Sequence, residues 1–168
     1  MFRIGDYVVY GSSGVCKIID IGTLSYDKSP EKRLYYTMEQ CFSTESKICI
    51  PVDNDKVFMR HIIDRENAMA LIDDMKNIEV LNIRDEKRCE NDYKEAMRNC
   101  SCRDLVKVIK TIYNRKQSRI AAGKKMTAGD EKYFKLAENS LYGEMAVALN
   151  MAKDEVRDFI CARLEEAY

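Results

Sequence analysis

Residues 5–15 read GDYVVYGSSGV, a β-branched and aromatic run that ends in a glycine–serine turn. Val and Tyr are enriched in strands, and a short Gly/Ser cluster after them is typical of a tight turn. Polar segments at 25–32 and 43–46 separate three further runs of this character, which lie at 15–21, 34–38 and 47–52. Short strands joined by turns over residues 1–60 predict a small Tudor-like or SH3-like β-barrel.

From residue 64 onward the apolar residues recur at the period of an amphipathic helix. Ser101 and Thr127 stand where helix N-caps are expected, each followed three residues later by an aspartate. An apolar stripe of Leu105, Val106, Val108, Ile109, Ile112 and Tyr113 predicts that the helix opened by Ser101 packs against a core. Two glycines interrupt the pattern between 120 and 129. We expect helical segments at 64–75, 84–98, after 101, over 134–149 and over 154–168.

These patterns predict an α+β chain with two domains. A small Tudor/SH3-like β-barrel occupies residues 1–60, and an all-helical domain occupies residues 61–168. The chain has 168 residues, which suits two small domains.

The composition indicates a soluble globular protein. Hydrophobic residues make up 46% of the chain and charged residues 33%, and no run is long enough to cross a membrane. The N-terminus reaches charged, strand-like sequence at once, which does not suit a signal peptide. We therefore expect a cytoplasmic protein.

Neither a metal site nor a catalytic set is indicated by the reactive residues. The seven cysteines are an odd number, and Cys100 and Cys102 are too closely spaced for a zinc knuckle, so reduced thiols are expected. His61 is the sole histidine, and no nucleophile motif accompanies it. The sequence predicts no cofactor, no metal and no enzymatic activity.

The zero net charge conceals a strongly basic segment. Residues 101–128 contain eight Lys/Arg and one Asp, whereas the rest of the chain is acidic. Such a local patch favours contact with phosphates, which release counterions on binding. A solvated helix face, or attraction to an acidic protein, explains the same residues. Nucleic-acid contact and this alternative both stay open on charge alone.

The ordered motifs resemble the CarD/CdnL family of bacterial RNA polymerase-binding regulators. Residues 5–15 are similar to the family opening, which reads roughly G-D-x-V-V-Y-P-x-H-G, and residues 48–52 resemble its fourth-strand V-x-V-P. Residues 93–94, 112–115 and 140–146 resemble its helical domain in the same order. The family often has a tryptophan shortly before Tyr93, but this chain has none, and Cys89 falls near that place.

The resemblance implies a function and two sets of contact residues. Residues 1–60 are expected to bind the RNA polymerase β subunit through Lys47, Ile48, Cys49, Ile50 and Pro51. The helical domain is expected to bind promoter DNA at the upstream edge of the bubble, largely independently of sequence. Its expected contacts are Cys89, Tyr93, Lys94, Arg98, Arg115, Lys116, Arg119, Lys124 and Lys125.

The expected result is a monomeric, non-enzymatic transcription regulator that changes open-complex stability. The alternative is a protein-only interaction module that binds polymerase or another factor without touching DNA. An enzyme of unknown type is a third reading, for which the sequence offers no coherent set of residues.

Overall fold

The structure is a computed structural model, and it describes residues 1–26, 28, 30, 32–44 and 47–166. The chain divides into two compact units, Met1–Ile62 and Ile63–Tyr168. The division falls two residues after the boundary expected from the sequence.

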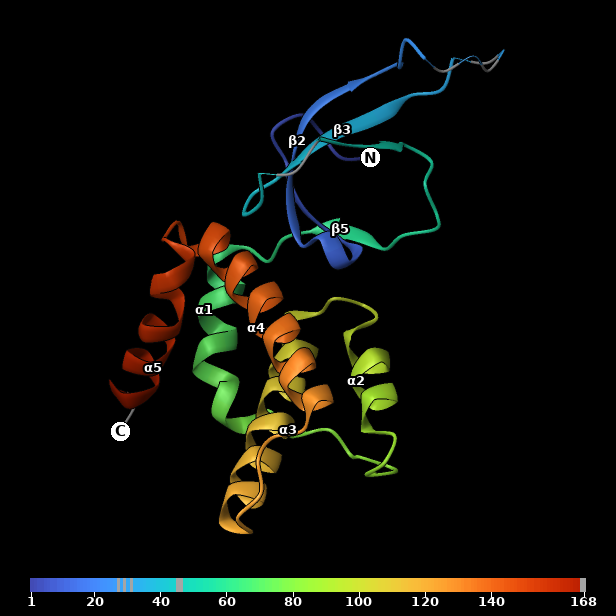
Figure 1. Cartoon of the computed structure of the whole chain (residues 1–168). Helices are drawn as coiled ribbons and strands as arrows, with labels where there is room; N and C mark the ends of the chain where they lie inside the picture. The colour runs from blue at the N-terminus through green and yellow to red at the C-terminus, as the bar shows by residue number, and fades with distance from the viewer. Residues whose placement is uncertain (27, 29, 31, 45–46, 167–168) are drawn as a thin grey trace. The chain divides into compact units, whose positions relative to one another are not determined.

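The N-terminal unit is a five-stranded antiparallel sheet in the order β4-β3-β2-β1-β5. Its strands, visible in Figure 1, are β1 (Tyr7–Tyr10), β2 (Val15–Gly22), β3 (Tyr35–Gln40), β4 (Ile48–Pro51) and β5 (Met59–His61). The α+β prediction is confirmed. The sheet is open, with β4 and β5 as its two edges, so the closed barrel is not confirmed and the Tudor-like character stays a prediction.

One face of this sheet carries the core. Its buried side chains come from four strands and are Val8, Cys16, Ile18, Tyr36, Met38 and Ile50. Alternation along each strand places them together, because successive side chains point to opposite faces. A register shift between Ile18 and Asp20 marks a bulge in β2.

The predicted turn after β1 is a short 3-10 helix, η1 (Gly11–Ser13). Gly11 has a φ of +46°, and a Cβ added there would lie 2.7 Å from the Val57 side chain. Both the backbone conformation and the close contact therefore require glycine. This turn opens a strand and not a helix, so it does not have the form of a phosphate-binding loop.

The C-terminal unit contains seven helical segments in its described part. They are α1 (Arg65–Asp74), η2 (Met75–Asn77), α2 (Cys89–Met97), α3 (Cys102–Ala121), α4 (Ala128–Leu149), η3 (Lys153–Glu155) and α5 (Val156–Glu166). A single apolar core joins them, and α3 packs along α4 (Figure 1).

The helix starts follow the predicted caps only in part. The Thr127 hydroxyl accepts the Asp130 N–H at 3.1 Å, as an N-cap should. Ser101 occupies the N-cap of α3 without a side-chain cap bond. The prediction of helix over 84–98 was too long, because α2 begins only at Cys89.

Some predicted features lie on residues that are not described. They are positions 27, 29 and 31 of the expected loop, positions 45–46 of the expected turn, and the last two residues of the expected final helix. In the part of the chain that is described, no helix is both long and apolar enough to cross a membrane.

Candidate protein and nucleic-acid interfaces

Strand β4 presents an open backbone edge. Val52 donates its N–H to the Leu34 carbonyl at 2.9 Å, which places Val52 in a hydrogen-bonded pair. Bonded and non-bonded pairs alternate along antiparallel strands, so Ile50 also bonds toward β3. Cys49 precedes Ile50 and forms a non-bonded pair with Thr37, so its N–H and C=O point to the open side. A partner strand could add there.

The neighbours of Cys49 limit this edge to a short contact. Pro51 faces the same way but has no N–H, and its carbonyl accepts the Asn54 N–H at 3.0 Å. On the preceding side, Lys47 lies 3.5 Å from a Glu39 carboxylate on β3. The edge therefore offers one donor and one acceptor at Cys49, flanked by a charged pair.

The five residues predicted to bind polymerase differ in how accessible their side chains are. Cys49 and Lys47 are exposed, Ile48 and Pro51 are half-buried, and Ile50 is buried in the sheet core. Backbone pairing at Cys49 explains how a strand with few accessible side chains could bind a partner.

Three of the eight Lys and Arg residues in segment 101–128 form contacts within the helical unit. Arg103 bonds Asp74 at 2.8 Å, and Lys107 lies 3.3 Å from Asp104. The Lys110 ammonium donates to the carbonyls of Met75 and Lys76, in η2, and of Ile78, its C-cap. These cations are less available to phosphates than the sequence count implies.

Arg115 belongs to a buried network centred on Asp130. Asp130 is fully buried and accepts from Tyr93 Oη at 2.9 Å and from Arg115 Nε at 3.1 Å. Arg115 also pairs with Glu86, and the Cys89 thiol lies 3.8 Å from Asp130. The network links α2, α3 and α4.

The network shifts the pKa of Tyr93 and that of Arg115. Burial raises the pKa of Tyr93, and the hydrogen bond to Asp130 raises it further, so the phenol stays neutral. Burial alone would lower the pKa of Arg115. Its hydrogen bonds to Glu86 and Asp130 outweigh that effect, so the pKa is raised and the guanidinium stays charged.

Three of the predicted DNA contacts are therefore enclosed. Cys89 and Tyr93 are buried, and the Arg115 side chain is only 16% exposed. A buried thiol and phenol cannot reach a duplex without a local rearrangement. We do not include these residues in the surface proposed to contact DNA.

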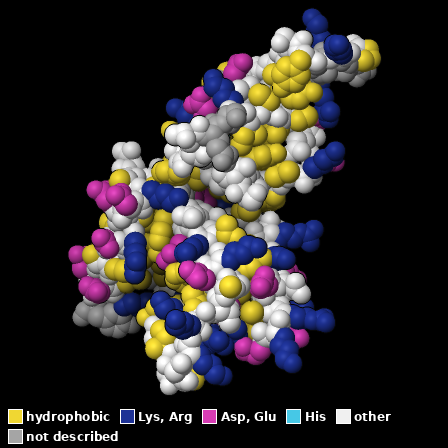
Figure 2. Space-filling model, viewed as in Figure 1, with side chains coloured by type: hydrophobic (Ala, Val, Ile, Leu, Met, Phe, Trp, Pro, Cys, Tyr) yellow, Lys and Arg dark blue, Asp and Glu magenta, His cyan; other side chains and the backbone are white. Residues whose placement is uncertain are grey.

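The remaining basic residues gather at the end of α3 and in the loop that follows. We name this surface the basic tip; its residues are Lys116, Arg119, Lys124 and Lys125. Arg119 Nε donates to the Lys125 carbonyl at 2.7 Å, and the Lys124 N–H donates to the Arg119 carbonyl at 2.8 Å. These bonds hold the loop against the helix. Figure 2 shows Lys and Arg side chains around this end of the helical unit.

Lys94 and Arg98 form a second, smaller basic site. Both are exposed, and they lie one helical turn apart on α2 and its C-cap. They belong to α2 and its C-cap, whereas the basic tip is formed by the end of α3 and the loop after it. Their role in DNA binding stays a prediction.

Comparison with family models identifies the N-terminal unit. Residues 2–63 match the family described as CarD-like/TRCF RID domain. The match confirms the resemblance seen in the first and fourth strands, and it supports an RNA polymerase-interacting, transcription-related protein. A comparison of the chain with curated proteins gave no match.

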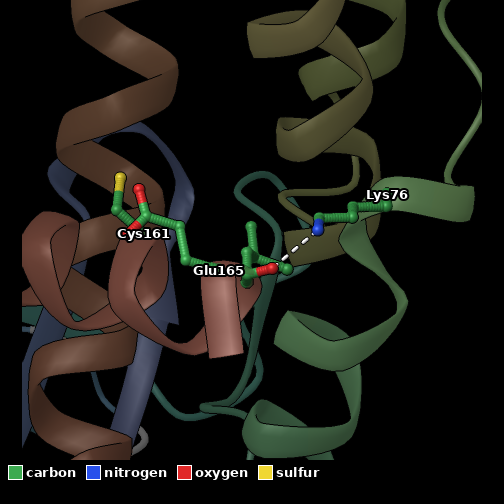
Figure 3. A pocket seen from close by; sticks show the side chains of 4 residues that line it. Lys76, Cys161 and Glu165 are labelled. Carbon is green, nitrogen blue, oxygen red and sulfur yellow. Dashed lines mark hydrogen bonds between the residues drawn. The ribbon is translucent and has the colours of Figure 1, made fainter. Parts of the chain in front are cut away.

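A shallow pocket lies in the helical unit, outside the CarD-like/TRCF RID domain. It has a volume of about 490 Å³ and lies between η2 and α5, lined by Lys76, Cys161, Leu164 and Glu165. The Lys76 ammonium donates to the Leu164 carbonyl at 2.6 Å. Figure 3 shows Lys76 on one side of this pocket and Cys161 and Glu165 on the other. None of the four residues that line the pocket is a buried polar residue. Among the described residues, no group of three or more His, Cys, Asp or Glu side chains could hold a metal ion.

Sequence reasoning missed two features of the helical unit. Asp130 was expected only as a first-turn acid of α4, but it is the buried centre of a network. Tyr113 was expected in the core stripe of α3, and this was wrong, because it is 51% exposed. One sequence feature could have indicated that Tyr113 is exposed: it is the last residue of the predicted stripe and is followed closely by Arg115 and Lys116.

Proposed function

We propose that this protein is a monomeric, non-enzymatic transcription regulator that binds two partners at once. The open edge of β4 binds the RNA polymerase β subunit, and the basic tip binds promoter DNA near the upstream edge of the bubble. Holding both partners changes the stability of the open complex. The observation that carries the proposal is an open strand edge in a CarD-like/TRCF RID domain.

The polymerase contact follows from the backbone at Cys49. A strand that adds to β4 gains an N–H and a C=O that point away from β3. Since these groups are main-chain, the contact does not need a particular side chain at position 49. The charged pair of Lys47 and Glu39 then helps to orient the partner.

A pair of variants at one position tests this contact. Cys49→Pro removes the outward N–H but leaves the bonds of Ile48 and Ile50 to β3, whereas Cys49→Ala removes the thiol and keeps the N–H. In a pull-down with purified β subunit, we expect Cys49→Pro to weaken binding about tenfold, as loss of a backbone pair should. Cys49→Ala should bind like the unmodified chain. Equal binding by Cys49→Pro, with its fold intact by circular dichroism, would contradict the proposed edge.

The DNA contact follows from the four cations of the basic tip. No acidic residue lies between Tyr113 and Lys125, and Lys124 and Lys125 are both exposed. Duplex phosphates attract such a surface without reading sequence. Polymerase supplies the location, so modest DNA affinity is sufficient when the two contacts are linked.

Charge reversal at the tip separates this function from a protein-only module. Lys124→Glu combined with Lys125→Glu should lower the slope of log K against log salt by about two for duplex DNA. The matched control reverses two exposed lysines of the CarD-like unit, Lys28→Glu with Lys56→Glu, and should leave the slope nearly unchanged. If the tip variant and the control variant change the salt slope by the same small amount, the protein-only alternative is favoured.

A further inference from the structure

The apolar stripe of α3 extends beyond the core that it helps to build. Val106 on this helix, seven residues before Tyr113, is 4% exposed. Farther along the helix, Tyr113 is 51% exposed and Ile120 is 53% exposed. Seven residues make nearly two full turns, so Tyr113 and Ile120 lie on the same side of α3. An aromatic ring and an aliphatic side chain thus form an exposed apolar strip.

The strip lies within the basic tip. Lys116 lies between its two members in sequence, Arg119 immediately precedes Ile120, and the Lys124 N–H donates to the Arg119 carbonyl. Figure 2 shows apolar surface beside the Lys and Arg side chains at this end of the helical unit. An exposed apolar strip with several cations and no acidic residue beside it in the sequence is complementary to a partner that carries both negative charge and flat apolar faces.

We propose that Tyr113 and Ile120 contact the unpaired bases of a nucleic-acid strand whose phosphates lie on the basic tip. This inference rests on the DNA contact proposed above and adds a preference for melted over paired DNA. The Tyr113 ring stacks on a base, which any base allows because each has a π-face. Ile120 packs against a second base farther along the strand.

The spacing of the two side chains suits a single strand. Seven helical residues span about 10 Å along the axis. Three stacked nucleotides span a similar length at about 3.4 Å each. In an intact duplex the faces of the bases are stacked on one another, so the strip would gain less from paired DNA.

Fluorescence anisotropy with two labelled DNA molecules tests the inference. One is a fully paired duplex, and the other is the same duplex with a central mismatched bubble. The unmodified full-length protein should bind the bubble more tightly. Tyr113→Ala and Ile120→Ala should each weaken bubble binding about fivefold to tenfold and change duplex binding little, because stacking is lost while the phosphate contacts remain. Tyr113→Phe should retain the preference, since it keeps the ring.

Control variants and outcomes separate the inference from the function on which it rests. Leu136→Ala removes another exposed apolar side chain of the same unit, on α4, and should have no effect. The inference is overturned if the protein binds both DNA molecules equally, or if Tyr113→Ala weakens both equally. If the protein shows no salt-dependent binding to either DNA, the proposed DNA contact itself fails. Loss of polymerase binding by Tyr113→Ala, with DNA binding intact, would assign the strip to a protein partner instead.

Discussion

At the scale of single residues, Asp130 is the point where three helices of the C-terminal unit are joined. It is fully buried and bonds Tyr93 of α2 and Arg115 of α3. We expect Asp130→Ala to destabilise the unit by about 3–5 kcal/mol, because it leaves a largely buried guanidinium with less compensation. Urea denaturation measures this. Glu131→Ala, which removes the neighbouring exposed acid, should stay within about 0.5 kcal/mol. Equal small losses for the two variants would contradict the role given to the network.

Cys16 predicts a stability change at alkaline pH. Burial, with the Cys41 thiol nearby, raises the pKa of the Cys16 thiol from 9.0 to about 11. The unfolded chain therefore releases this proton first, and stability should fall as the pH rises from about 9 to about 11. Thermal unfolding at pH 7, 9 and 10.5 tests the sign. Cys16→Ala should show a smaller decline over this range than the unmodified chain. An identical decline would show that other groups cause it.

At the scale of elements, the two long helices of the C-terminal unit begin differently. The Thr127 side chain accepts a backbone N–H at the start of α4, whereas Ser101 makes no such bond at the start of α3. Thr127→Ala should therefore cost about 1 kcal/mol in urea denaturation, and Ser101→Ala clearly less. A loss for Ser101→Ala as large as that for Thr127→Ala would contradict the assignment of the caps.

The type of each element, strand or helix, was predictable because it depends on the pattern of apolar residues within one short segment. The β-branched and aromatic run around Val8, ended by a Gly/Ser turn, identifies a strand, and the helical spacing around Leu71 identifies a helix. The order of the strands was not predictable, since it depends on pairing between distant segments. The open edge at Cys49 became visible only once the β3–β4 register was known.

The candidate sites were less predictable than the fold, for a physical reason. The sequence showed a basic block, but ion pairs form between residues that are distant along the chain. Arg115 pairs with Glu86 and Asp130, and Arg103 pairs with Asp74. Only the structure separates these cations from the accessible ones, Lys124 and Lys125, at the basic tip.

At the scale of the whole molecule, the proposed function is that of a tether between polymerase and DNA. The CarD-like domain has an open strand edge, and the helical unit has a basic tip, so each unit carries one proposed contact. Linking two weak contacts raises the effective concentration of each for its partner. The effect on transcription should then require both ends, and neither contact alone should reproduce it.

The lifetime of a promoter open complex tests this claim most directly. It would be measured with purified RNA polymerase and the full-length protein, in the unmodified form, as Cys49→Pro, as Lys124→Glu with Lys125→Glu, and with all three changes. The tether predicts that the unmodified protein changes the lifetime, that each end variant loses most of this change, and that the combined variant loses little more. A full effect retained by either end variant would contradict the tether.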